Sequence, residues 1–274
     1  GLLRHPDQGQ LRQAFALAMA AMRLQMRQAA INQGKGASEP AWRPFQLGFL
    51  LVALASTVNE AHKDRDLVDL IWFPTGGGKT EAYLGLAAIE VFRRRLHYGA
   101  EGGGTAVITR YTLRLLTAQQ FLRASALICA MEILRTTDPR AQGMAPFSIG
   151  LWIGNEASPA TLSDAKDALE RLHKAARPQE ANEFQIESCP WCLAQLVPPK
   201  RSQDRSHYGI RLSGNDIVVH CTDASCEFVS QLPLSVIDDV LYDEPPTILL
   251  ATVDKFARLQ FKPQAGRLLG LNTA

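Results

Sequence analysis

The sequence predicts an α/β fold in which short parallel strands alternate with longer helices. Two observations support this prediction. Four short apolar runs, at 66–73, 105–109, 147–153 and 247–251, have the length and composition of buried strands, and a helical pattern follows each one. A segment with paired cysteines, 184–232, interrupts the alternation with short β-like runs and basic loops, which indicates an inserted lobe.

Helices are expected before, between and after these runs. Apolar residues recur at steps of three and four between 11 and 32, which predicts an amphipathic helix. Pro44 favours the first turn of a second helix that would end near His62, and Ser163 is a candidate N-cap for a later one. The helices expected after the four runs are 79–97, 113–135, 163–176 and one beginning near 253.

This order of elements predicts three parts. We expect an N-terminal helical segment at 1–40, an α/β domain made of 41–183 and 233–274, and the inserted lobe at 184–232. The 274 residues are 46% hydrophobic and 20% charged, a composition typical of globular proteins. The chain is therefore long enough for a sizeable hydrophobic core.

Charge and cysteine content exclude several classes of protein. The 29 Lys and Arg residues nearly balance the 27 Asp and Glu residues, so any contact with nucleic acid needs local basic stripes. Five cysteines are too few for a disulfide scaffold of this length. No apolar run approaches the roughly 20 residues of a membrane span. Arg12, Arg23 and Arg27 interrupt the apolar N-terminal stretch, unlike a signal peptide. We expect a cytoplasmic protein with no membrane partner.

A glycine-rich turn between the first predicted strand and its helix carries the strongest functional signal. It reads Phe73-Pro74-Thr75-Gly76-Gly77-Gly78-Lys79-Thr80. Glycines let backbone N–H groups approach phosphate oxygens, and a helix N-terminus adds a favourable dipole. Lys79 would reach the β- and γ-phosphates, and the Thr80 hydroxyl would ligate Mg²⁺. The strict pattern begins with Gly or Ala rather than Phe73, and the alternative is a glycine-rich turn with an incidental Lys-Thr pair.

This loop resembles motif I of superfamily 2 helicases, a resemblance that extends into Glu81-Ala82. Upstream, Arg43-Pro44-Phe45-Gln46 resembles the Q-motif, in which a glutamine amide pairs with the edge of adenine. An ordinary glutamine at a helix start is the alternative. The residues expected to bind ATP and Mg²⁺ are Gln46, Thr75, Gly76, Gly77, Gly78, Lys79, Thr80 and Glu81, with Lys79 and Thr80 as the expected catalytic pair.

The ends of the later strands are candidate nucleic-acid contacts. Strand-to-helix turns lie at the carboxyl ends of parallel strands, where open α/β sheets bind ligands. These turns resemble motifs Ia and Ib of superfamily 2 enzymes and a further motif with which those enzymes bind a nucleic-acid strand. The alternatives are solvated helix starts and, for Thr252, a simple N-cap. The expected contacts are Thr109, Arg110, Tyr111, Thr112, Arg114, Gly154, Asn155, Thr252 and Lys255.

The cysteines of the insertion predict a metal site. Cys189 and Cys192 form a CxxC pair, and Cys221 and Cys226 form a Cx4C pair. Two such pairs are typical of a tetrahedral four-cysteine Zn²⁺ site of zinc-ribbon kind. Four thiolates leave no open position on the metal, so the zinc would be structural. Redox pairs or separate thiols are the alternative. Cys129 lies on an apolar helix face and is expected in the core.

Several of these segments together resemble one family, the helicase subunit of DISARM anti-phage defence systems, which is related to helicases with a DUF1998 region. The resemblance covers about residues 42–262, and its most specific parts are TRYTLRLLTAQQF and TVDKF. It implies an incomplete RecA-like P-loop domain in an ATP-dependent DNA helicase or translocase. It also implies single-stranded DNA, or duplex with a single-stranded end, as substrate and a DUF1998-type partner subunit.

The acidic residues of an ATPase are not expected within this chain. The pair Asp243-Glu244 precedes the TVDKF turn, whereas superfamily 2 enzymes place motif II after it. We therefore expect the chain to be the N-terminal part of a larger motor and inactive alone. A non-catalytic, nucleotide-sensing interaction module stabilised by zinc remains the alternative.

Overall fold

The computed structural model describes residues 2–36, 39–72, 78–111, 114–154, 158–257 and 259–271. The chain divides into two compact units. One comprises Gly1–Ala106 and Ala130–Pro146, and the other comprises Val107–Cys129 and Phe147–Ala274. The domain boundaries expected from the sequence stay predictions.

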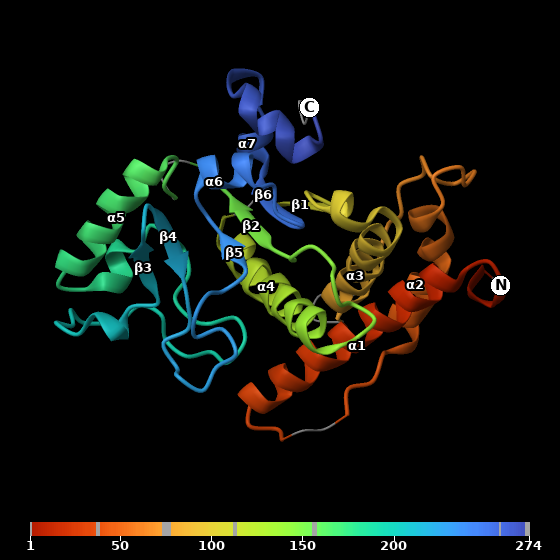
Figure 1. Cartoon of the computed structure of the whole chain (residues 1–274), viewed down its shortest axis with the longest axis horizontal. Coiled ribbons are helices and arrows are strands. Elements are labelled where there is room, and N and C mark those ends of the chain that lie inside the picture. The colour runs from red at the N-terminus through yellow and green to blue at the C-terminus, as the bar shows by residue number, and fades with distance from the viewer. Residues whose placement is uncertain are drawn as a thin grey trace. The chain divides into compact units, whose positions relative to one another are not determined.

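The first unit is helical. Its helix α3 packs against both α1 and α2, and these helices can be followed in Figure 1. Leu17 and Met22 of α1 and Ile89 and Phe92 of α3 are fully buried, so the amphipathic pattern read from the sequence is confirmed. The elements are η1 (Leu2–Arg4), α1 (Gly9–Asn32), α2 (Pro44–Val58), α3 (Lys79–Tyr98), η2 (Gly99–Gly102) and the last turns of α4 (Arg114–Thr137).

One expected strand is not formed in the part of it that the structure describes. Residues 66–72 have no strand pairing, and the side chains of Val68, Leu70 and Trp72 are 94%, 81% and 86% exposed. An apolar run of this length predicts a strand only if a sheet edge is available to pair with it. Asp66 and Asp69 also interrupt the run and favour a solvated segment. The prediction of a buried strand here is wrong for residues 66–72.

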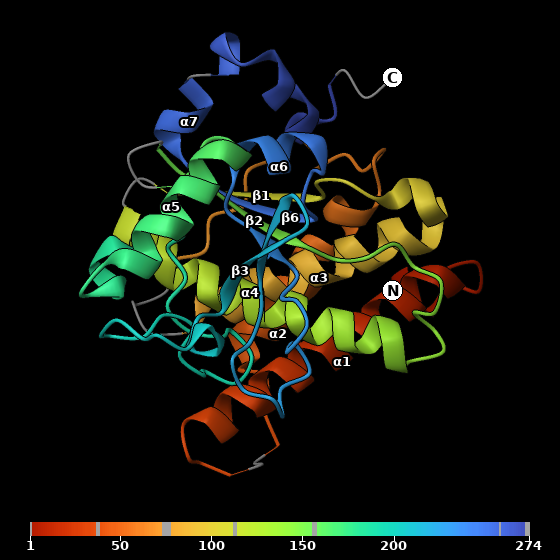
Figure 2. The same cartoon turned by 60° about the vertical axis from the view of Figure 1, so that its left-hand side comes forward.

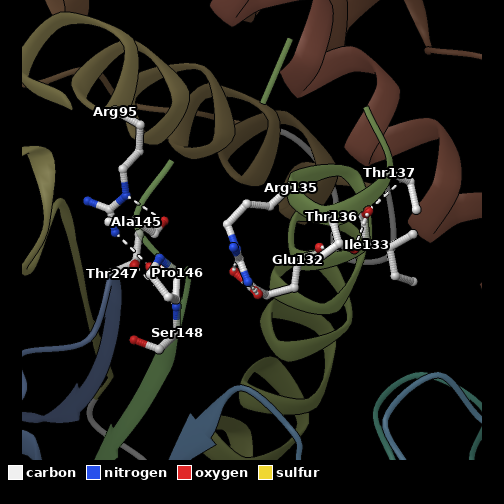
Figure 3. A network of polar contacts seen from close by, with 10 residues as sticks. All are labelled: Arg95, Glu132, Ile133, Arg135, Thr136, Thr137, Ala145, Pro146, Ser148 and Thr247. Carbon is white, nitrogen blue, oxygen red and sulfur yellow. Dashed lines mark hydrogen bonds and ion pairs between the residues drawn. The ribbon is translucent and has the colours of Figure 1, made fainter. Parts of the chain in front are cut away.

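The end of α3 is held by a buried arginine, Arg95, which Figure 3 shows in detail. Its guanidinium donates hydrogen bonds to the carbonyl oxygens of Gly102, Ala145 (3.2 Å) and Pro146 (2.9 Å). Burial, followed by the neighbouring charge of Arg94, lowers the pKa of Arg95 to about 10. Arg95 therefore joins the chain after α3 to the chain after α4.

The second unit contains a four-stranded parallel sheet in the order β1-β6-β2-β5. Its central strands β2 and β6 are buried at every residue, whereas β1 alternates between half-buried and exposed residues. The predicted α/β class and three of the four strand runs are therefore confirmed. The strands are β1 (Val107–Tyr111), β2 (Ile149–Trp152), β5 (Leu234–Ser235) and β6 (Ile248–Thr252).

Short helices cover one end of this sheet, as Figures 1 and 2 show. Helix α6 contacts β2, and a Cβ on Gly150 would meet Leu241 at 2.6 Å and Pro246 at 2.7 Å, so β2 needs glycine at this position. Helix α7 continues directly from β6. The elements here are α6 (Asp238–Asp243), α7 (Val253–Ala257), η5 (Leu259–Phe261) and η6 (Pro263–Leu269).

The inserted segment of the second unit is built around a hairpin that packs on α5. Strands β3 and β4 pair antiparallel, and Gly214 supplies the positive φ that their turn requires. The N-cap of α5 is Thr161, which forms a capping box with Asp164, rather than the expected Ser163. The elements are α5 (Leu162–Lys174), η3 (Pro178–Ala181), η4 (Arg205–His207), β3 (Ile210–Ser213) and β4 (Asp216–Val219).

Among the described residues, no helix combines the length and the apolar character needed to cross a bilayer.

Candidate functional site

The structure brings together the sulfur atoms of all four cysteines predicted to bind metal. The Sγ atoms of Cys189, Cys192, Cys221 and Cys226 lie within 4.8 Å of one another. Cys189 and Cys226 are 4.0 Å apart, and Cys192 and Cys221 are 3.4 Å apart. Tetrahedral Zn²⁺ with Zn–S bonds of about 2.3 Å would separate its ligands by about 3.8 Å, so the cluster has the size of a zinc site.

Tight backbone turns position each cysteine pair. In the first turn, the Cys189 carbonyl accepts from the amide of Leu193 at 2.9 Å, and Leu193 adopts a φ of 63°. In the second turn, the Asp223 amide donates to Cys221 Sγ at 3.4 Å. The Thr222 hydroxyl donates to the Gln195 carbonyl at 2.8 Å and joins the two turns. Hydrogen bonds to the backbone and to one sulfur atom therefore hold the site in place.

Burial makes this cluster suited to a cation. Cys189, Cys221 and Cys226 are at most 6% exposed, and burial raises the pKa of all three thiols, that of Cys226 to about 12. Buried thiols resist ionisation unless a positive charge compensates them, and a divalent metal supplies that charge. The cluster can therefore hold a metal such as zinc, and its four sulfur ligands would leave no position for catalysis.

The helix α3 begins where the phosphate-binding loop was predicted. Gly78 is its N-cap, with a φ of 87°, and Lys79 is its first residue. Thr80 is 9% exposed, and Glu81 lies in the first turn. Thr75, Gly76 and Gly77 lie outside the described residues. The helix is 20 residues long, so its N-terminus provides the favourable dipole that a phosphate would use.

Gln46 links the starts of α2 and α3. Its Oε1 accepts from the Arg43 amide at 2.8 Å, and its Nε2 donates to the Gly78 carbonyl at 2.7 Å. The residue is 3% exposed. The predicted contact with adenine stays a prediction, but the structure shows that both ends of this amide also hold the protein backbone. Sequence reasoning missed the link, because no pattern pairs residues 32 positions apart.

The sheet gathers several of the predicted nucleic-acid contacts at one end. Tyr111 of β1 pairs with Thr252 of β6, and Trp152 of β2 pairs with Ala251 of β6. Arg110 is exposed, whereas Thr252 is 5% exposed. Thr109 lies within β1, and Gly154 follows β2 by two residues. Thr112 and Asn155 lie outside the described residues, as does the side chain of Arg114 in α4. Nucleic-acid binding by this end of the sheet stays a prediction.

Lys255 occupies a different environment from that of a solvent-facing contact. It is 4% exposed, and its Nζ forms a buried ion pair with Asp238 of α6. The Tyr242 hydroxyl donates to the same Asp238 oxygen at 3.4 Å, and Trp152 Nε1 donates to the Tyr242 oxygen at 3.1 Å. Burial raises the pKa of Asp238, and burial with the Asp238 charge raises that of Tyr242 to about 12.

Sequence reasoning missed Asp238, Tyr242 and Trp152. The i, i+4 spacing of Asp238 and Tyr242 in a helix of six residues is too weak a signal to find from the sequence. The predicted Lys255 contact with nucleic acid stays a prediction, and it would require the ion pair with Asp238 to open.

These features define an α/β protein with an inserted four-cysteine lobe. The chain is similar to the DISARM protein DrmA of Bacillus paralicheniformis, with 39% identity over 241 residues. The match covers 84% of this chain but 21% of that protein, so the chain spans about a fifth of the length of its relative. No family model matches the chain. The match agrees with the DISARM resemblance of the sequence motifs. Helicase activity and a DUF1998 relationship stay predictions.

Proposed function

We propose that the complete protein is an ATP-dependent DNA translocase or helicase of superfamily 2 that acts in defence against phage DNA. The observation that carries the proposal is the start of α3, where Gly78 caps a long helix that opens with Lys79 and Thr80. The similarity to a DISARM protein supports the role in defence. Activity, substrate and partner are proposed for the whole protein.

ATP and Mg²⁺ fit the residues at the start of α3. The start of α3 is the positive end of the dipole of a 20-residue helix, which favours an anion such as a phosphate group. Lys79 would contact the β- and γ-phosphates, and the Thr80 hydroxyl would ligate Mg²⁺. The bound metal would neutralise charge that develops on the transferred phosphoryl group. Gln46 fixes the Gly78 carbonyl, and it therefore positions the turn from which Lys79 projects.

DNA is proposed to cross the end of the sheet formed by β1, β6 and β2. Arg110 offers an exposed cation there, and backbone amides after Trp152 and Thr252 offer hydrogen-bond donors. Such contacts recognise the phosphodiester backbone rather than the sequence of bases. A DUF1998-type subunit is the proposed protein partner, and co-purification of the two proteins would test it.

The finer fold assignment, an incomplete RecA-like P-loop domain, belongs to this proposal. The parallel sheet with α4 directly after β1 supports it. The assignment predicts that bound nucleotide protects the first turns of α3. Amide hydrogen exchange at the start of α3 should then slow on addition of ATP and Mg²⁺. Unchanged exchange there with saturating nucleotide would contradict this fold assignment.

The cysteine cluster is proposed to stabilise the protein rather than to take part in catalysis. Zn²⁺ bound by the four cysteines would stabilise the inserted lobe, and it would add to a small buried core that includes Phe184, Leu196 and Tyr208. The metal would take no part in ATP hydrolysis, because four sulfur ligands complete its coordination.

The test is ATP hydrolysis by the complete protein with and without single-stranded DNA. We expect DNA to stimulate turnover and Lys79→Ala to abolish it, while the exposed control Lys63→Ala keeps wild-type turnover. Turnover that DNA does not change would contradict a motor. Nucleotide binding without any turnover would instead favour the nucleotide-sensing interaction module.

A further inference from the structure

A cavity of 330 Å³ lies beside the buried Asp238–Lys255 pair in the second unit. Its volume is at the lower end of the range of small-ligand pockets. Trp152, Tyr242 and Phe261 supply aromatic walls, and Asp238, Asp239, Lys255 and Lys262 supply the charged groups. The residues come from the end of β2, from α6 and α7, and from the segment that follows α7. The cavity therefore combines flat apolar walls with a few polar groups.

One polar atom at this cavity has an unmet hydrogen-bonding requirement. Asp238 is 4% exposed, and its Oδ2 receives both the Lys255 ammonium and the Tyr242 hydroxyl. Its other oxygen, Oδ1, is buried and accepts no hydrogen bond from the described part of the chain. Buried carboxylate oxygens without a donor are rare in folded proteins. Asp238 lines the cavity, so a ligand there could supply the missing N–H or O–H group after a side-chain movement that uncovers Oδ1.

The charge balance indicates what kind of donor fits. Lys255 already neutralises Asp238, and Asp239 and Lys262 add one charge of each sign, so a cationic ligand would leave the lining with an uncompensated positive charge. A neutral N–H donor meets the need of Oδ1 without that cost. The cavity therefore favours a neutral polar group over a metal ion or an ammonium group.

The aromatic walls indicate a planar ligand. Trp152 is held in place by its hydrogen bond to Tyr242 and by edge contacts with Tyr242 and Phe256, whose ring centroids lie 6.2 and 5.4 Å away. Phe261 lines the same cavity and is 71% exposed, so its ring is available to a ligand. Planar aromatic groups stack on such side chains.

We propose that this cavity takes a single unstacked nucleobase, whose N–H group donates to Asp238 Oδ1 and whose ring lies against Phe261. Lys262 is exposed beside the cavity and can contact the attached phosphate. Trp152 ends β2 and Lys255 lies three residues after β6, so the cavity is at the same end of the sheet as the proposed DNA contacts. The inference rests on the proposed function, in which DNA supplies the base, and it adds a binding site for one base of that DNA.

Photo-crosslinking of the complete protein with 5-iodouracil tests this assignment. The iodinated base is used in a single-stranded DNA oligonucleotide and, separately, as free 5-iodouridine monophosphate. We expect irradiation to join the oligonucleotide base to Phe261, Tyr242 or Trp152, as located by mass spectrometry. A crosslink from the free nucleotide alone would identify a mononucleotide site instead of a strand contact. Absence of crosslinks to these three residues with both probes overturns the proposal.

Binding measurements separate base recognition from backbone binding. Phe261→Ala should weaken binding of a base-containing oligonucleotide by roughly 5- to 150-fold, and it should leave an abasic oligonucleotide of equal length unaffected. Leu271→Ala, at an exposed apolar residue outside the cavity lining, is the matched control and should change neither affinity. Equal losses for both oligonucleotides would overturn base recognition while DNA binding stands. If neither oligonucleotide binds the wild-type protein, the proposed DNA motor is contradicted. The crosslinking result with free 5-iodouridine monophosphate then decides alone whether the cavity binds a base.

Discussion

The side-chain amide of Gln46 donates a hydrogen bond of 2.7 Å to the carbonyl oxygen of Gly78, which lies 32 residues later in the chain. The same amide accepts from the backbone of Arg43 at the start of α2. Gln46 thus ties the first turn of α2 to the N-cap of α3, and Gly78 is the last residue before Lys79. The geometry of the proposed phosphate site depends on this link.

Replacing Gln46 with Glu should weaken that link. A carboxylate cannot donate to the Gly78 carbonyl, and it would place two acceptors together in a buried position. We expect Gln46→Glu to lower the free energy of unfolding by about 1–3 kcal/mol and to reduce nucleotide affinity. Chemical denaturation and nucleotide titration measure the two effects. The exposed control Gln231→Glu, in a loop, should change neither quantity, and a Gln46→Glu protein with wild-type values would show that the link is unimportant.

Gly78→Ala should be more harmful than the same change at Gly34. Both glycines have a positive φ, 87° at Gly78 and 70° at Gly34, so alanine strains both by a similar amount. A Cβ on Gly78 would also lie 2.7 Å from Gln46 Nε2, whereas one on Gly34 would meet nothing within 4 Å. The difference between the two free energies of unfolding therefore measures the crowding against Gln46. Equal destabilisation would contradict this close approach.

Metal analysis should find about one zinc for each chain. Cys189→Ser should release this zinc and lower the Tm of the lobe, because one of its four ligands is lost. Removal of the metal by a chelator should have the same effect on the wild-type protein. Cys129→Ala, at a buried cysteine outside the cluster, is the matched control and should keep its zinc. A stable, metal-free wild-type chain would refute the metal site.

Acid should weaken the packing of α5 on the inserted lobe through His173. This residue contacts Tyr208 edge-on at 4.6 Å, and its buried Nε2 has no hydrogen-bond partner among the described residues. Burial, together with the charge of Arg205, lowers the pKa of His173 from 6.5 to about 4. The unfolded chain therefore binds the proton more tightly, and stability should fall as the pH drops from about 6.5 to about 4, by at most about 3 kcal/mol.

Chemical denaturation at several pH values measures whether the free energy of unfolding falls as the pH drops. His173→Phe should remove most of the dependence between pH 6.5 and 4, since phenylalanine has no proton to gain. His207→Phe, at an exposed histidine, should leave it in place. Identical pH profiles for wild-type protein and His173→Phe would show that another group is responsible.

The Asp238–Lys255 pair should behave as a buried ion pair. Lys255→Met alone leaves a buried carboxylate without its cation and should cost about 3–5 kcal/mol of stability. The double change Asp238→Leu with Lys255→Met removes both charges and should recover most of that loss. Free energies of unfolding from denaturant titration provide the comparison. A double variant as unstable as Lys255→Met would mean that the residues contribute independently.

Regular patterns in the sequence predicted the elements that bury an apolar face. The spacing of Ala18 and Met22 predicted α1, and the continuous apolar run at 247–251 predicted β6, because each pattern directly reflects burial in the fold. The cysteine pairs predicted their own cluster, since a tetrahedral metal restricts the spacing of its ligands.

Features that depend on a distant partner could not be predicted in this way. The run at 66–73 looks like a strand, but strand formation depends on a neighbouring edge that the run itself does not encode. The same reason applies to Lys255, which looked like a surface contact because its partner Asp238 lies 17 residues earlier in an unrecognised helix. Long-range pairs of this kind set the chemistry of both the Gln46 link and the cavity beside Trp152.

The most direct test of the central claim is a calorimetric titration of the chain with Mg²⁺ and a non-hydrolysable ATP analogue. We predict binding of about one nucleotide for each chain, loss of that binding in Lys79→Ala, and wild-type binding in Lys63→Ala. Absence of binding to the wild-type chain, or equal binding by Lys79→Ala, would contradict a triphosphate site at the start of α3.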